Sequence, residues 1–204
     1  MWSSNILRWG AIATMLTGVF LILIDVFSIP SFGFPEQYWV TNLLESARFA
    51  VALVGLVGLY LYLRRSSRFG RLRTVGFYML IAASVPGVII YLGLALNEGV
   101  WKQWSNAFGP IYVFLTVVGA ELFAVAILRA GSLPRVGAWL WIVAIPIFLF
   151  AVVASTAAPG GSSLSNWANW AFIVAGTVFG LGWIILGYGL WLHRDEPVQP
   201  ATVR

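Results

Sequence analysis

The sequence predicts an all-α fold, a polytopic membrane bundle of six transmembrane helices with the N and C termini in the cytoplasm. Hydrophobic side chains make up 60% of the 204 residues and charged ones only 9%, a composition unlike that of soluble domains. Six apolar segments are each long enough to cross a hydrocarbon core of about 30 Å, at about 1.5 Å per helical residue. The basic residues gather in the loops of one side, which predicts the orientation.

The first three spans are expected at about 6–28, 42–63 and 74–97. An arginine before the first apolar run is typical of a signal peptide. The residues at 25–30 form a poor cleavage site, however, and the run is long enough to span, so we expect a retained helix. The second span ends where a segment with five arginines begins, at 64–73, and the third follows that segment directly.

The last three spans are expected at about 108–130, 135–158 and 167–192. A short basic turn joins the fourth to the fifth, and a proline–glycine segment separates the fifth from the sixth. A short polar cytoplasmic tail is expected at 193–204. Because the spans leave no stretch that would fold as a soluble domain, residues 1–192 are expected to form one transmembrane domain.

The distribution of positive charge predicts the orientation in the membrane. With an even number of spans, ten of the 12 basic residues lie on the side of both termini, Lys102 lies on the other side, and Arg48 lies within a span. Cytoplasmic loops carry the excess of Lys and Arg, so both termini are expected in the cytoplasm and the protein in the plasma membrane. This also accounts for the net charge of +5, and no nucleic-acid partner is expected.

The turn between the fourth and fifth spans carries a resemblance to known proteins. Its sequence, Arg-Ala-Gly-Ser-Leu-Pro-Arg-Val-Gly-Ala at 129–138, resembles a loop of uncharacterised six-span bacterial integral membrane proteins, a family of unknown function. The resemblance covers these residues and the general pattern of spans. It implies a six-span membrane fold, and it transfers no reaction and no catalytic residue.

Glu121 is the most isolated ionisable residue within the predicted spans. It is expected somewhat inward of the midplane, where an ionisable group costs at least about 2.5 kcal/mol unless it faces a protein interior, a cavity or a partner. Side chains expected at similar depth on other helices are candidate partners: Thr14, Thr17, Ser84 and Trp141. Two interpretations stay open, a carboxyl that binds a proton or cation and a protonated acid that ties two helices together.

Three further charged residues are expected in the outer leaflet. Glu45 and Arg48 are three residues apart, so they share one face of the second span and are expected to pair. Asp25, near the outer end of the first span, lies at comparable depth. The three residues form either an outer vestibule for a polar or charged ligand, or a structural ion pair near the interface.

Prolines and glycines predict the local shape of three spans. Pro86 and Pro146 lie near the middle of the third and fifth spans and predict kinks, which either line a cavity or simply bend the helices. Gly176, Gly180 and Gly187 place a smooth groove on one face of the last span. The groove predicts close helix packing, within the chain or between copies.

The chain lacks the residues that most membrane enzymes need. It has no cysteine and a single histidine, His193, and no lysine lies within a predicted span. Thiolate and histidine-rich metal sites and a Schiff-base lysine are therefore excluded. Neither a phosphate-binding loop nor a His-Glu-x-x-His motif occurs. We expect no catalytic residue, no metal and no cofactor.

The function predicted first is that of a non-catalytic accessory, sensory or assembly component of a membrane complex. Its expected contacts are the lipid bilayer and either a membrane-protein partner or a second copy. A small proton- or cation-coupled transporter or carrier that uses Glu121 is the first alternative. A binder or enzyme for a lipophilic small molecule is the second.

Overall fold

The computed structural model describes residues 4–27, 38–66, 70–157 and 163–193. Six α-helices make up nearly all of this part of the chain: α1 (Ser4–Phe27), α2 (Tyr38–Ser66), α3 (Gly70–Leu96), α4 (Glu98–Ala130), α5 (Arg135–Ala157) and α6 (Ser163–Leu192). All six are long and apolar enough to cross a membrane. The predicted all-α bundle of six transmembrane helices is confirmed.

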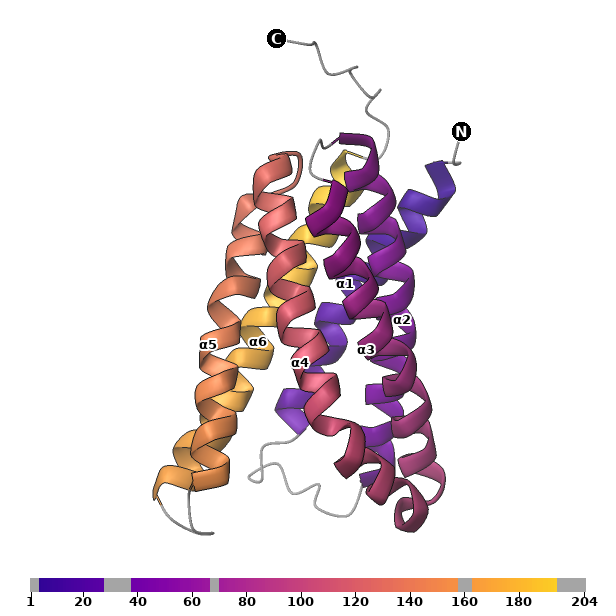
Figure 1. Ribbon diagram of the computed structural model, residues 1–204. Helices are drawn as coiled ribbons and strands as arrows, with labels where there is room; N and C mark the ends of the chain where they lie inside the picture. The colour runs from indigo at the N-terminus through magenta and orange to yellow at the C-terminus, as the bar shows by residue number, and fades with distance from the viewer. Residues whose placement is uncertain (1–3, 28–37, 67–69, 158–162, 194–204) are drawn as a thin grey trace.

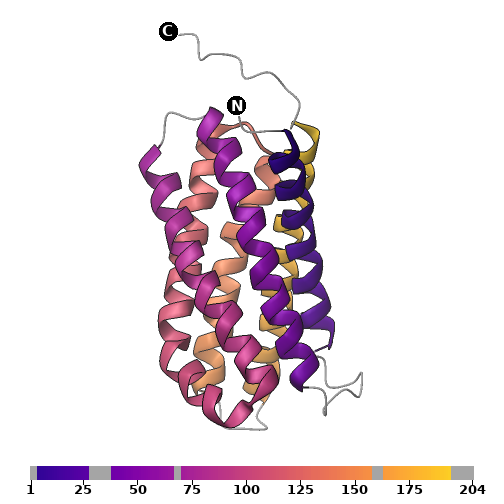
Figure 2. The same ribbon diagram turned by 90° about the vertical axis from the view of Figure 1, so that its right-hand side faces the viewer.

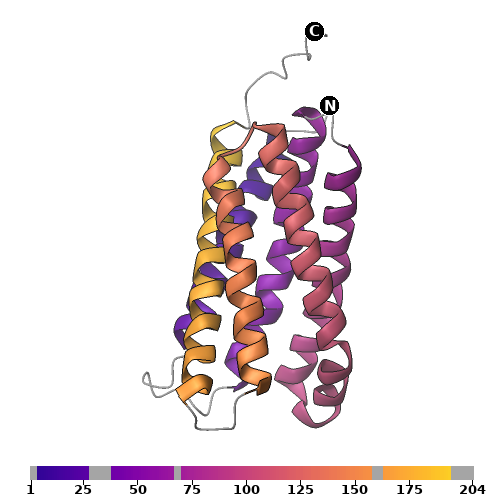
Figure 3. The same ribbon diagram turned by 60° about the vertical axis from the view of Figure 1, so that its left-hand side comes forward.

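The helices run up and down the bundle (Figure 1), and their contacts form a ring. Each helix packs against the next one along the chain, and α6 closes the ring by packing against α1. Figure 2 shows α1, α2 and α3 side by side, and Figure 3 shows α5 between α4 and α6. The start of α1 and the end of α6 lie at one end of the bundle, here called the terminal end, and the junction of α3 with α4 lies at the far end.

The contact between α1 and α6 depends on glycines. A Cβ atom on Gly180 would lie 2.8 Å from the carbonyl oxygen of Gly18, and one on Gly187 would lie 2.8 Å from that of Ala11. Such close approach of two helix backbones through small residues is common in membranes. The groove predicted from Gly176, Gly180 and Gly187 therefore packs inside the chain.

The terminal half of the bundle is filled by apolar side chains. Trp141 and Phe123 are fully buried there, with ring centroids 6.4 Å apart. Trp141 also packs against Phe179 at 5.0 Å and Trp183 at 4.7 Å. Leucines of α1, α2 and α6 complete this core: Leu7, Leu56, Leu59, Leu63, Leu186 and Leu190. This half of the bundle is therefore closed across its axis.

Hydrogen bonds secure the turns at the terminal end. Gly131 ends α4 with φ of 65°, a left-handed conformation that glycine adopts without strain, and its N–H donates to Ile127 O at 3.1 Å. Tyr62 of α2 donates its hydroxyl hydrogen to the carbonyl oxygen of Ser132 at 3.1 Å. These bonds hold the α4–α5 turn against the rest of the bundle.

The α4 helix begins at Glu98, well before the predicted start of the fourth span at residue 108. Residues 98–107 are too polar to belong to an apolar span, yet they continue the helix. At 33 residues α4 is about 50 Å long, against about 30 Å of hydrocarbon. Hydropathy predicts the part of a helix that lies in lipid, and the helix itself continues beyond it.

The other predicted boundaries lie within four residues of the observed helix ends. Residues 28 and 158 of the predicted spans, and residues 194–204 of the predicted tail, lie outside the described residues. Pro86 and Pro146 lie inside α3 and α5 as the spans predicted, and both helices are continuous through them. Each proline lacks the N–H that would bond the carbonyl four residues earlier.

Candidate functional site

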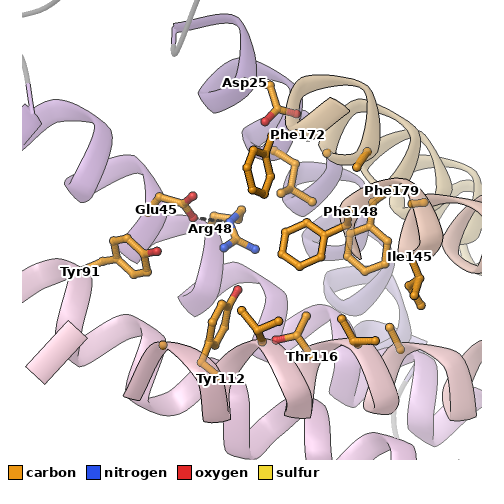
Figure 4. Close-up of a pocket in the computed structure, with 18 residues that line it drawn as sticks. Asp25, Glu45, Arg48, Tyr91, Tyr112, Thr116, Ile145, Phe148, Phe172 and Phe179 are labelled. Atoms are coloured by element: carbon orange, nitrogen blue, oxygen red, sulfur yellow. Dashed lines mark hydrogen bonds and ion pairs between the residues drawn. The ribbon is translucent and has the colours of Figure 1, made fainter. Parts of the chain in front are cut away.

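A cavity of about 420 Å³ lies in the far half of the bundle (Figure 4). All six helices line it, and we call it the charged pocket after three of its lining residues, Asp25, Glu45 and Arg48. Its volume falls within the range of about 300–1,000 Å³ that is usual for small-molecule sites. The charged pocket is polar along one side and apolar along the other.

Arg48 and Glu45 form an ion pair on the polar side. Arg48 Nε donates to Glu45 Oε2 at 2.6 Å, and both side chains are largely buried. The two residues are one turn apart on α2, so the pairing predicted from their spacing is confirmed. A buried charge without a partner is costly, so the removal of either residue should destabilise the protein by leaving the other charge uncompensated.

Aromatic rings hold the Arg48 guanidinium in place. Its Cζ lies 3.9 Å from the centroid of the Phe49 ring, a cation–π contact. Phe49 in turn stacks on Tyr91 at 5.6 Å and meets Tyr112 edge to face at 5.5 Å. The hydroxyl groups of both tyrosines point toward the charged pair (Figure 4). The guanidinium is therefore positioned by α2, α3 and α4 together.

Asp25 is the third charged residue of the pocket, and its carboxylate is not fully paired. Asp25 Oδ2 is buried and has no hydrogen-bond partner among the described residues. The carboxylate lies against Gly176 of α6, where a Cβ atom would collide with both of its oxygens. Gly176 thus makes room for Asp25, which is more specific than the packing role that the sequence predicted for it.

The opposite side of the charged pocket is apolar. Phe148 of α5 and Phe172 of α6 meet edge to face at 5.6 Å, and Phe179 and Leu21 extend the same surface. Thr116 of α4 is a polar exception, since its buried Oγ1 has no hydrogen-bond partner in the described part of the chain. In Figure 4, Asp25 and Thr116 lie on opposite sides of the pocket.

The wall between α4 and α5 is the least tightly packed. These two helices make the sparsest contacts of all neighbouring pairs in the ring. Both helices line the charged pocket, α4 from Gly109 to Ala120 and α5 from Ala144 to Phe148. Pro110 and Pro146 lie in these two stretches, and each removes a hydrogen bond that would stiffen its helix.

The predicted kink sites lie close to cavities. Pro86 lines a smaller cavity of about 70 Å³ that shares Tyr91 and Tyr112 with the charged pocket. Pro146 follows two residues that line the charged pocket, Ala144 and Ile145. Pro86 thus lines a cavity and Pro146 lies next to one, and the two interpretations, kinks that line a cavity and simple bending of the helices, both stay open.

Glu121 does not belong to the charged pocket. The preceding residue, Ala120, lines the pocket, but the side chain of Glu121 is exposed on the outside of the bundle. Among the described residues it has no hydrogen-bonding or ion-pair partner. The expectation that Glu121 reaches another helix is corrected, because the rotation of α4 about its axis turns this side chain outward.

The expected partners of Glu121 have other surroundings. Thr14 and Thr17 donate to carbonyl oxygens in their own helix, at 2.6 Å to Gly10 O and 2.8 Å to Ala13 O. Trp141 is in the core, and its Nε1 has no hydrogen-bond partner within the described ranges. Ser84 is buried in α3.

Several lining residues were not predicted. Tyr112 and Thr116 are four residues apart on α4, so they form a hydroxyl-bearing face that the helical spacing would have indicated. Phe148, Phe172 and Phe179 carry no comparable signal, because phenylalanine is as common on lipid-facing surfaces as on pocket walls. Their convergence depends on how the helices pack.

The arrangement supports binding by charge and hydrogen bonds. No cluster of three or more His, Cys, Asp or Glu side chains that would hold a metal ion occurs in the described part of the chain. Glu45 is paired with Arg48, while Asp25 and Thr116 offer polar atoms toward the pocket.

Comparisons with protein families, with curated proteins and with solved structures found no match.

Proposed function

We propose that this chain is a non-catalytic integral membrane protein that binds a lipophilic small molecule in the charged pocket. The observation that carries the proposal is a cavity of about 420 Å³ with charged groups on one side and phenylalanines on the other. Small-molecule sites between the helices of bundles are mainly apolar and have a few placed polar groups. A sensory component of a membrane complex would have such a site.

The polar groups of the pocket favour binding over catalysis. The described lining offers carboxylates, one guanidinium and hydroxyl groups, and Glu45 is already engaged by Arg48. General acid–base or nucleophilic catalysis requires an activated group with a partner that moves its proton. The pairing of Glu45 with Arg48 and the aromatic rings around the guanidinium support a fixed binding surface instead.

The position of the pocket supports entry of the ligand from the bilayer. Its least tightly packed wall lies between α4 and α5, whose outer surfaces expose many large apolar side chains beside Glu121. A molecule dissolved in lipid would reach the pocket between these helices without crossing water. On the terminal side of the pocket, the bundle is filled by Trp141, Phe123 and Trp183. This closed core supports a ligand that stays in the pocket over one that passes through the bundle.

We further propose that the protein lies in the plasma membrane with both termini in the cytoplasm. The support is the ten basic residues expected on the side of the termini, against Lys102 on the other side. In this orientation the charged pocket would lie in the outer half of the membrane.

A proton- or cation-coupled carrier that uses Glu121 has less support. Glu121 is exposed on the outside of the bundle and does not line the charged pocket. A coupling carboxyl is expected to face the cavity that holds the transported species.

Ligand-dependent stabilisation tests the proposed function. The full chain in lipid nanodiscs would be screened by melting temperature against lipophilic amines, alcohols and acids, since a ligand that binds only the folded state raises the melting temperature. Val113→Trp adds bulk to the α4 wall of the pocket and should abolish the rise. Ile111→Trp, at a position 55% exposed on the same helix, is the matched control and should retain it. Equal stabilisation of both variants would place binding elsewhere and contradict the proposal.

A further inference from the structure

We infer that the ligand of the charged pocket is an amphipathic amine, with its protonated amino group at Asp25 and its apolar body on Phe148 and Phe172. This inference rests on the proposed function and adds the chemical class of the ligand. It begins from two buried polar atoms without partners in the described residues, Asp25 Oδ2 and Thr116 Oγ1.

Asp25 offers an acceptor for which the described chain supplies no donor. A buried acceptor without a donor is unfavourable, so a donor on the ligand would be favoured at this position. Arg48 is already bonded through Nε to Glu45 at 2.6 Å. The glycine at position 176 leaves space for the Asp25 carboxylate beside α6, where any side chain would block it. The described residues therefore hold an acceptor at the pocket and supply no donor for it.

The charge balance of the pocket selects a cation. The lining holds two carboxyl groups, Asp25 and Glu45, and one guanidinium, that of Arg48. With both carboxyl groups ionised, the pocket carries one negative charge in excess. In a surrounding of low dielectric constant an ammonium group would compensate that charge. A ligand carboxylate would instead bring a third anion to one guanidinium, and a neutral alcohol would leave the charge uncompensated.

The apolar side of the pocket accommodates the rest of such a molecule. Phe172 lies one helical turn before Gly176, the residue that the Asp25 carboxylate contacts, and its ring meets Phe148 edge to face at 5.6 Å (Figure 4). The faces of aromatic rings attract cations, and their area buries an apolar body. Thr116 Oγ1, on the opposite side from Asp25, would meet a second polar group of the ligand.

Three matched probes test the ligand class: 4-phenylbutylamine, 4-phenylbutan-1-ol and 4-phenylbutyrate. They share an apolar body and differ in the polar end. Binding to the full chain in nanodiscs would be measured by titration calorimetry at neutral pH, with empty nanodiscs as the blank for partitioning. We expect the amine to bind at least about tenfold more tightly than the other two, because a charge-assisted hydrogen bond is stronger than a neutral one.

Substitution of Asp25 tests whether the preference for the amine over the alcohol depends on this carboxylate. Asp25→Asn should bring amine and alcohol to about equal affinity, and Asp25→Ser provides the same test if the asparagine variant does not fold. Glu121→Gln, which removes a carboxyl outside the pocket, should retain the full preference.

The outcomes separate this inference from the proposed function. Equal binding of amine and alcohol to the wild type, tighter binding of the acid, binding of none of the probes, or an amine preference unchanged in the Asp25 variants would each overturn the amine class. The proposed function would still stand if other lipophilic compounds stabilise the wild type and Val113→Trp abolishes that effect. It would fall if Val113→Trp and Ile111→Trp behave alike.

Discussion

Arg48 Nε and Glu45 Oε2 lie 2.6 Å apart in the half of the bundle that contains a cavity. The sequence left open whether these residues form a structural ion pair or part of a vestibule. In the structure the pair is itself part of the pocket wall, and the ring of Phe49 lies against the guanidinium at 3.9 Å. One arrangement thus contributes both to stability and to the polarity of the pocket.

Removal of Arg48 alone should destabilise the protein more than removal of the pair. Arg48→Ala leaves a largely buried carboxylate without its partner and should cost about 3 kcal/mol, whereas Arg48→Ala combined with Glu45→Ala should cost less. Unfolding in mixed micelles measures both free energies. The control is Lys102→Ala, whose bond to Glu98 at 3.3 Å is exposed and should contribute no more than about 1 kcal/mol. Strictly additive effects at Arg48 and Glu45 would rule out the coupling.

Gly180→Ala should loosen the contact between α1 and α6. The added methyl group would lie 2.8 Å from the Gly18 carbonyl oxygen and 3.0 Å from Ile22, so the helices must separate, at a cost of about 1–3 kcal/mol. Gly109→Ala is the matched control, because nothing lies within 4 Å of its Cβ position, and it should be neutral or stabilise by up to about 1 kcal/mol. The melting temperatures of the two variants in one detergent make the comparison, and similar losses in both would contradict the packing argument.

Trp141→Ala should be among the most destabilising changes in the core. Trp141 is 0% exposed and packs against Phe123, Phe179 and Trp183, so its truncation leaves a large cavity and should cost about 3–5 kcal/mol. Trp139→Ala removes the same side chain from a position that is 55% exposed and should cost less than about 0.5 kcal/mol. Chemical unfolding would show the difference. A small effect at Trp141 would mean that the terminal half is not closed as described.

Glu121→Leu should not lower the melting temperature of the monomer. The side chain is exposed on the outside of α4, where leucine suits lipid better than a carboxyl that costs at least about 2.5 kcal/mol within a membrane. Ligand binding in the charged pocket should also be unchanged. Thermal unfolding together with probe titration checks both expectations, and a lower melting temperature would indicate an interhelical bond to Glu121.

The number of helices and their order could be predicted from the sequence because burial in lipid selects long apolar segments one at a time. All six spans were identified, and α5 begins at the predicted residue, Arg135. The start of α4 at Glu98 was missed because residues 98–107 are polar. Backbone hydrogen bonding continues a helix outside lipid, and a hydropathy pattern does not register it.

The candidate site could be predicted only where the interacting residues lie close together in one helix or at a depth that the span itself indicates. The spacing of Glu45 and Arg48 within one helix determines that they share a face, so their pairing followed from residue numbers. Depth along the span likewise brought Asp25 to the same level. The direction in which Glu121 points depends on the rotation of α4 against α3, and that rotation follows from which small residues meet, such as Gly119 and Gly76.

The difference between the features that the sequence determined and those that the packing decided has a physical cause. Transfer of a segment into lipid and pairing within one helical turn involve only neighbouring residues, so the amino-acid sequence specified the spans and the Arg48–Glu45 pair. The cavity, the space that Gly176 leaves for Asp25 and the approach of Phe148 to Phe172 arise between helices far apart in the chain. Such contacts depend on how whole helix surfaces fit together, and the packing of the bundle decided them.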